Sequence, residues 1–126
     1  MTMRTPLRQA RGLGSAKEGV GHWWAQRVTA IALVPLTLWF VASLLSLIGA
    51  DHAAVLAWIG SPVPAVLLIL LLTISFYHAQ LGLQVVFEDY IHHKGGKLAA
   101  ILFVKFACLL LGVATVFSVL KIAFQG

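Results

Sequence analysis

The stretch Ser75-Phe-Tyr-His-Ala-Gln-Leu-Gly-Leu-Gln-Val-Val-Phe-Glu-Asp-Tyr90 joins an apolar run to a polar one and carries an ionisable group, His78, well inside the apolar part. The first charged residue after His78 is Glu88. At about 1.5 Å per helical residue, His78 lies roughly 15 Å below the polar boundary, near the middle of a hydrocarbon layer about 30 Å thick. An imidazole at that depth needs a partner, so the stretch predicts a spanning helix with a functional histidine.

The composition predicts an all-α integral membrane protein. Of the 126 residues, 60% are hydrophobic and 10% are charged, whereas soluble domains are about half apolar and a quarter charged. The formal net charge is +5, but the basic residues flank apolar runs, which indicates orientation in a membrane and no nucleic-acid partner. The single cysteine, Cys108, lies in an apolar run and offers no disulfide.

Three apolar runs predict three spans, at about residues 28–48, 65–87 and 98–120. We expect a basic segment over residues 1–27 at the inner face and a three-helix membrane domain over residues 28–126. The first run is about twenty uncharged residues, too long for a secretory signal, whose apolar core has about 7–15. A mitochondrial transit peptide stays open for the arginine-rich start.

The charge distribution predicts the orientation of the spans. The basic residues before the first span share one side with Lys94 and Lys97, and the loop containing Asp51 and His52 falls on the other. The positive-inside rule then places the amino terminus inside and the carboxyl terminus outside.

With this orientation Arg27, Asp89 and Tyr90 share the inner face. The guanidinium of Arg27 could reach a lipid phosphate, or it could hold an acidic group of a cofactor. Tyr90 is either an ordinary interfacial aromatic residue or a functional phenol. The adjacent His92 and His93 point in different directions and do not form the i,i+4 pair of a helical metal site.

Three interpretations of His78 remain open from the residues alone. It could hydrogen-bond a neighbouring helix, ligate haem, or relay protons or ions. Gly82, one turn later, would let either a flat macrocycle or another helix come close. A haem with two strong axial ligands would need its second ligand from another chain, because no other histidine here lies at the depth of His78.

The pattern His78-x3-Gly82 followed by Asp89-Tyr90, with Arg27-Val-Thr-Ala-Ile opening the first of three spans, resembles a known family. It is similar to the succinate dehydrogenase hydrophobic membrane anchor subunit, the D subunit of respiratory complex II, of alphaproteobacterial or mitochondrial type. The likeness covers essentially the whole chain. It implies three helices packed against a second anchor subunit, with one haem b held between the two.

The resemblance also implies roles for individual residues. His78 would be an axial ligand of the haem b iron, Arg27 would lie near the haem propionates, and Gly82 would pack against the haem. Tyr90 would lie at the carbonyl of ubiquinone, with Asp89 beside it. No dicarboxylate-handling catalytic residue is expected in this chain, because that chemistry belongs to another subunit.

The function implied is that of a non-flavin subunit of succinate dehydrogenase, passing electrons from the iron–sulfur subunit to ubiquinone as substrate. The partners would be a second cytochrome b anchor subunit, the iron–sulfur subunit, the flavoprotein subunit and membrane lipid. The expected location is the bacterial inner membrane as a multi-pass protein, with the mitochondrial inner membrane as the alternative. The alternative functions are the anchor of a fumarate reductase or other b-type quinone oxidoreductase, and a small transporter or proton channel using His78 as a relay.

Overall fold

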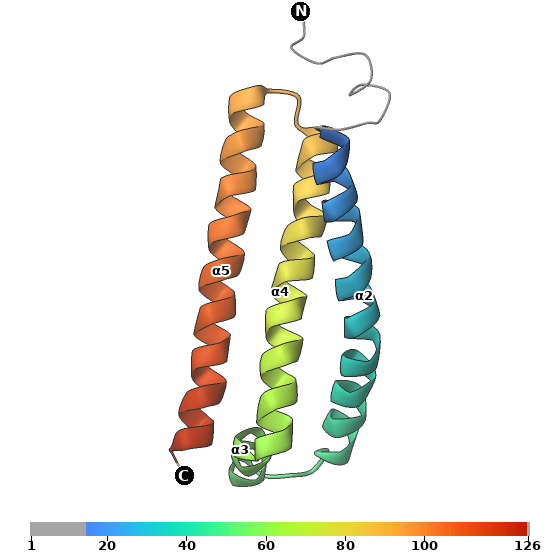
Figure 1. The fold of residues 1–126 in the computed structure, drawn as a ribbon. Coiled ribbons are helices and arrows are strands. Elements are labelled where there is room, and N and C mark those ends of the chain that lie inside the picture. The colour runs from blue at the N-terminus through green and yellow to red at the C-terminus, as the bar shows by residue number, and fades with distance from the viewer. Residues whose placement is uncertain (1–14, 126) are drawn as a thin grey trace, which may run out of the picture.

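The structure is a computed structural model that describes residues 15–125, and in that range the chain is helical throughout apart from short connections. The helices are α2 (Ser15–Ser46), α3 (His52–Gly60), α4 (Pro62–Tyr90) and α5 (Lys94–Phe124). The three long helices run side by side with α4 in the middle, and short α3 lies at the end where α2 leads into α4 (Figure 1). This arrangement confirms the all-helical prediction.

Three helical segments are long and apolar enough to cross a membrane: Val20–Ser46, Pro62–Tyr90 and Lys94–Phe124. The prediction of three spans is therefore confirmed. Helix α2 begins before the predicted span, because nothing between Ser15 and Arg27 stops a helix and hydropathy marks only its apolar part. Residues 15–27 thus continue the first span as helix, while the first half of the predicted basic segment lies outside the described residues.

The connection between the first two spans follows from local sequence. Gly49 adopts a positive φ of 85°, a conformation that suits glycine and ends the preceding helix. Asp51 then caps α3, since its Oδ1 accepts the backbone N–H of Ala54 at 2.9 Å. Pro62 occupies the first turn of α4, where its missing N–H costs nothing.

Few side chains are buried among the described residues, and one hydrophobic cluster of them lies at the α3 end of the bundle. Ala65 and Leu68 of α4 pack there against Val119 of α5, and large aromatic residues surround them. The rings of Trp39 on α2 and Trp58 on α3 stack with centroids 5.7 Å apart and an interplanar angle of 23°. These contacts hold the short helix against the spans.

Most of the remaining apolar surface is uncovered within this chain. The exposed fraction is 71% for Ile31, 73% for Phe103 and 70% for Leu110. Surface of this kind on three spanning helices needs lipid or another protein subunit to cover it.

Gly60 tests the contact that holds α3 in place. A Cβ at this position would touch the backbone of α5, 3.4 Å from the carbonyl oxygen of Ile122. Gly60→Ala should be tolerated, whereas Gly60→Leu should lower the free energy of unfolding by about 1–3 kcal/mol through overpacking. Thermal denaturation of the assembled protein in detergent measures the difference. Gly21→Leu is the control, because nothing lies within 4 Å of a Cβ there, and an equal effect of both leucines would contradict the prediction.

Candidate functional site

His78 on α4 is held by Thr29 on α2. The two side chains are joined at 2.8 Å between Thr29 Oγ1 and His78 Nδ1, in a partly buried contact. The interpretation of His78 as hydrogen-bonded to a neighbouring helix is therefore confirmed. The contact uses only one nitrogen of the ring. The other, Nε2, has no hydrogen bond within the described residues and is not fully buried.

The Thr29–His78 contact also locates Arg27 along the bundle. Arg27 precedes Thr29 by two residues, which is about 3 Å of helix, whereas Tyr90 follows His78 by twelve residues, about 18 Å. Along the bundle, Arg27 therefore lies closer to the level of His78 than to the level of Tyr90. The charge distribution had predicted instead that Arg27 and Tyr90 share the inner face. The physical reason is that α2 continues well past residue 27 towards its amino end.

The side chain of Arg27 is exposed and lies over an aromatic ring. Its guanidinium carbon is 5.1 Å from the ring centroid of Trp23, which is a cation–π contact. This contact orients the guanidinium but leaves its hydrogen-bond donors available for an anionic group.

Gly82, one turn after His78, faces α2. A Cβ at Gly82 would lie 3.7 Å from Nε2 of Gln26, so the glycine lets a side chain of the neighbouring helix approach. The helix-contact interpretation of Gly82 is confirmed in this respect, and packing against haem stays a prediction. The Oε1 atom of Gln26 is buried without a hydrogen-bond partner in the described part of the chain.

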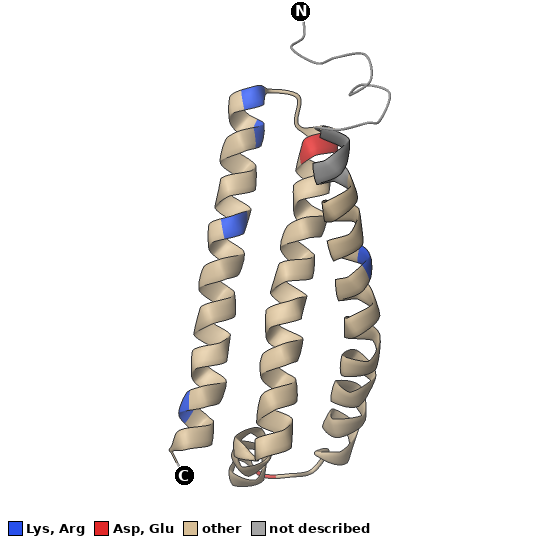
Figure 2. Cartoon of the chain, viewed as in Figure 1, with Lys and Arg blue, Asp and Glu red and all other residues tan. Residues whose placement is uncertain are grey.

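Asp89 and Tyr90 form the carboxyl end of α4. Tyr90 is 78% exposed, Asp89 is exposed as well, and neither side chain forms a hydrogen bond within the described residues. The chain then leaves the helix at Ile91, whose N–H donates to the carbonyl of Phe87 at 3.0 Å. The same end of the bundle carries acidic residues of α4 and the first lysines of α5 (Figure 2). Both predicted quinone-binding side chains are thus presented outward at a polar end.

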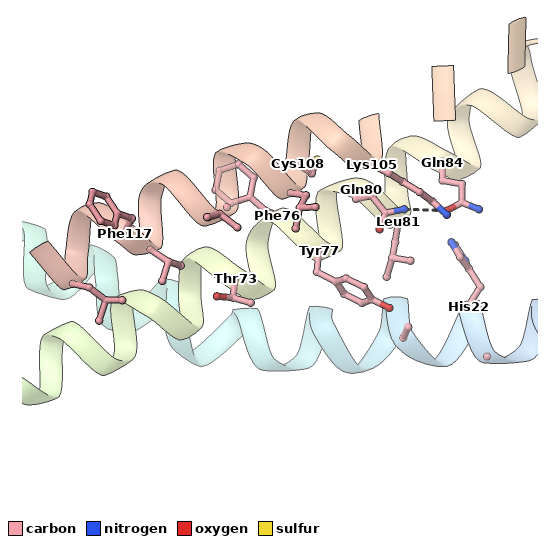
Figure 3. A pocket seen from close by; sticks show the side chains of 17 residues that line it. His22, Thr73, Phe76, Tyr77, Gln80, Leu81, Gln84, Lys105, Cys108 and Phe117 are labelled. Carbon is pink, nitrogen blue, oxygen red and sulfur yellow. Dashed lines mark hydrogen bonds between the residues drawn. The ribbon is translucent and has the colours of Figure 1, made fainter. Parts of the chain in front are cut away.

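A cleft of about 990 Å³ lies between α4, α5 and the first part of α2. Most of its lining is apolar, but the polar side chains of His22, Gln80, Gln84 and Lys105 gather at one end of it (Figure 3), and Thr73 and Tyr77 line it as well. The side-chain amide of Gln80 donates to Gln84 Oε1 at 3.1 Å, and that of Gln84 donates to Glu88 Oε1 at 3.1 Å. A row of hydrogen-bonded polar side chains thus runs along α4 towards its polar end. Sequence reasoning missed this row, although polar residues at i,i+4 intervals in an apolar run are its signal.

The cleft is separate from the predicted site. Its lining includes none of the residues assigned to haem or quinone: His78, Gly82, Arg27, Asp89 and Tyr90. The half-buried ring of His78 and the exposed phenol of Tyr90 both lie outside this cleft.

The adjacent histidines after α4 have different environments. Nδ1 of His93 accepts the backbone N–H of Gly96 at 3.0 Å and caps the first turn of α5. His92 is exposed and forms no hydrogen bond within the described residues. Among those residues, no three His, Cys, Asp or Glu side chains gather in a way that could hold a metal ion. The one imidazole at His78 suits a metal that brings most of its ligands in a macrocycle.

Comparison with known protein families identifies the family of this three-span chain. Residues 1–113 match the family described as succinate dehydrogenase/fumarate reductase transmembrane subunit, and the chain belongs to this family. No solved structure matches the chain significantly.

The relatives refine this assignment. A succinate dehydrogenase hydrophobic membrane anchor subunit from Paracoccus denitrificans is 38% identical over 99 residues, covering 79% of this chain and 76% of the relative. The subunit of the same name from Rickettsia bellii is 36% identical over 116 residues, covering 92% of this chain and 93% of the relative. The resemblance predicted from the sequence is confirmed: the protein is a multi-pass membrane anchor subunit of succinate dehydrogenase.

The capping role of His93 can be tested with its neighbour as the control. His93→Ala should destabilise the first turn of α5 by about 1 kcal/mol, because the N–H of Gly96 loses its acceptor. His93→Ser should restore the cap, and His92→Ala should have no effect. Hydrogen exchange at the first amides of α5 measures these changes. Equal exchange in the two alanine variants would show that the ring of His93 does not stabilise the helix.

Proposed function

We propose that the chain helps bind haem b and ubiquinone within succinate dehydrogenase, with His78 as one axial ligand of the haem iron. The observation that carries this proposal is the state of the His78 ring, whose Nδ1 is engaged by Thr29 while Nε2 is free among the described residues. An imidazole with one free ring nitrogen matches the donor that haem iron takes from histidine. When bound, haem supplies a one-electron redox centre whose potential depends on its axial ligands and surroundings.

The neighbours of His78 fit the same group. Along the axis of α2, Arg27 is about 3 Å from Thr29, the residue that contacts His78. The exposed guanidinium of Arg27 can form a bidentate pair with a propionate carboxylate. The packing of Gly82 against haem is proposed from the resemblance alone, since the side chain of Gln26 from α2 lies over this glycine. The second axial ligand would come from a second anchor subunit, and the uncovered apolar faces of the spans support such a partner.

Tyr90 and Asp89 are proposed to bind ubiquinone at the inner face. The exposed phenol of Tyr90 can donate a hydrogen bond to a quinone carbonyl, and this bond strengthens as negative charge develops on the oxygen during reduction. Asp89 follows His78 by eleven residues, which places both on the same face of α4. The exposed carboxylate of Asp89 can pass protons towards the reduced oxygen of the quinone. The protein's contribution is placement of donors, while electrons arrive from the iron–sulfur subunit.

The assembly proposed includes the flavoprotein subunit, which oxidises succinate, and the iron–sulfur subunit. We place it in the bacterial inner membrane with the amino terminus inside, in line with the basic residues and the bacterial relatives. The relatives' names favour succinate dehydrogenase over fumarate reductase, and nothing in these comparisons supports a transporter.

The ligand role of His78 is tested by an optical spectrum of the complex purified with its partner subunits. The wild-type complex should show reduced b-type bands, and His78→Ala should lose them because the iron loses an axial ligand. His52→Ala is the control, since His52 lies at the start of α3 at the opposite end of α4. Unchanged bands in His78→Ala would remove His78 as the ligand.

The role of Tyr90 is tested by removing only its hydroxyl. Tyr90→Phe should lower the rate of ubiquinone reduction about 100-fold, as expected for one lost hydrogen-bond donor to a developing oxyanion, with the haem spectrum retained. Tyr77→Phe is the matched control, because it removes the only other tyrosine hydroxyl of the chain. Full activity of Tyr90→Phe with ubiquinone would defeat the assignment.

A further inference from the structure

Thr29 Oγ1 lies within hydrogen-bond distance of three atoms. The carbonyl oxygens of Ala25 and Gln26, in the preceding turn of α2, are 2.7 and 3.0 Å away. Nδ1 of His78 is 2.8 Å away on the other side. A hydroxyl has one hydrogen to donate and two lone pairs to accept with, so the three contacts cannot all receive a proton from Thr29.

The two carbonyls settle the direction of the bonds, because a carbonyl oxygen can only accept. If the hydroxyl donated to His78, the close contact with Ala25 would join two oxygens with no hydrogen between them. The hydroxyl of Thr29 therefore donates to the backbone of α2, and its oxygen accepts a proton from the ring. His78 is then the tautomer with hydrogen on Nδ1, and the lone pair lies on Nε2.

We propose that Thr29 is a positioning residue that sets the tautomer and the ring orientation of His78, so that Nε2 is the atom offered to the haem iron. This inference rests on the proposed function and assigns Thr29 a part in it. A hydrogen bond to the outer nitrogen of a metal-bound histidine fixes the ring and raises its basicity as a ligand. Donation from Thr29 to the α2 backbone strengthens that effect, because a donating hydroxyl is a better acceptor.

The group that accepts the Nδ1 proton of His78 is an uncharged hydroxyl. A carboxylate in the same place would draw the Nδ1 proton strongly and carry a charge into the apolar bundle, which is costly. A threonine hydroxyl bonded back to its own helix adds no charge at this depth.

The chain contains a matched control for Thr29. Thr115 on α5 makes the same two backbone bonds, to the carbonyls of Leu111 at 2.9 Å and Gly112 at 3.0 Å. It has no side-chain partner among the described residues. Thr115→Val therefore removes the same intrahelical bonds as Thr29→Val but leaves every histidine untouched.

The test is a redox titration of the haem in the purified complex, followed optically, for Thr29→Val, Thr29→Ser and Thr115→Val. Loss of the acceptor makes His78 a weaker donor, which disfavours ferric iron. We expect a roughly tenfold change in the ferric-to-ferrous equilibrium, an upward shift of about 59 mV for one electron. Thr29→Ser, which keeps the hydroxyl, and Thr115→Val should both titrate like the wild type.

The outcomes separate this inference from the proposed function. A wild-type midpoint potential in Thr29→Val, with the bands lost in His78→Ala, overturns the role of Thr29 and leaves the ligand assignment intact. Retention of the bands in His78→Ala overturns both. Thr29→Ala, titrated in parallel, removes the hydroxyl without a branched replacement and gives the same comparison where valine hinders assembly. A shift in Thr115→Val as large as in Thr29→Val would also overturn the role of Thr29.

Discussion

The hydrogen bond between Thr29 and His78 is the interaction on which the arrangement of this membrane subunit depends. A polar ring in the hydrocarbon region must find a partner inside the protein, because no water is available there. The partner comes from α2, so the bond sets which turn of α2 faces which turn of α4. The positions of Arg27 near His78 and of Gln26 over Gly82 follow from that register.

Much of the apolar surface of this chain is left uncovered by the chain itself. One cluster of buried residues lies at the α3 end, where aromatic rings from α2 and α3 stack beside Ala65 and Leu68 of α4. Leu81 and Val104 are buried elsewhere in the bundle, and long apolar faces of all three spans remain uncovered. Small residues such as Gly60 allow close packing where the chain contacts itself. This division agrees with a membrane anchor subunit, whose exposed faces are made to meet lipid and neighbouring subunits.

Two polar systems run through the apolar bundle and serve different surfaces. One joins Thr29 to His78 and leaves a ring nitrogen available beyond it. The other runs from Gln80 through Gln84 to Glu88 along the cleft. His78 does not line the cleft, whereas the charged side chain of Lys105 does.

The sequence by itself determined the helical membrane fold, the three spans, the family and the residues of interest, because hydropathy and the spacing of His78, Gly82, Asp89 and Tyr90 are properties of a single helix. It did not show which α2 side chain meets His78, nor that α2 starts as early as Ser15. Those facts depend on how two helices far apart in sequence are aligned. Only the tertiary structure decided that alignment, because a contact between spans depends on depth and rotation, which no local pattern in either helix records.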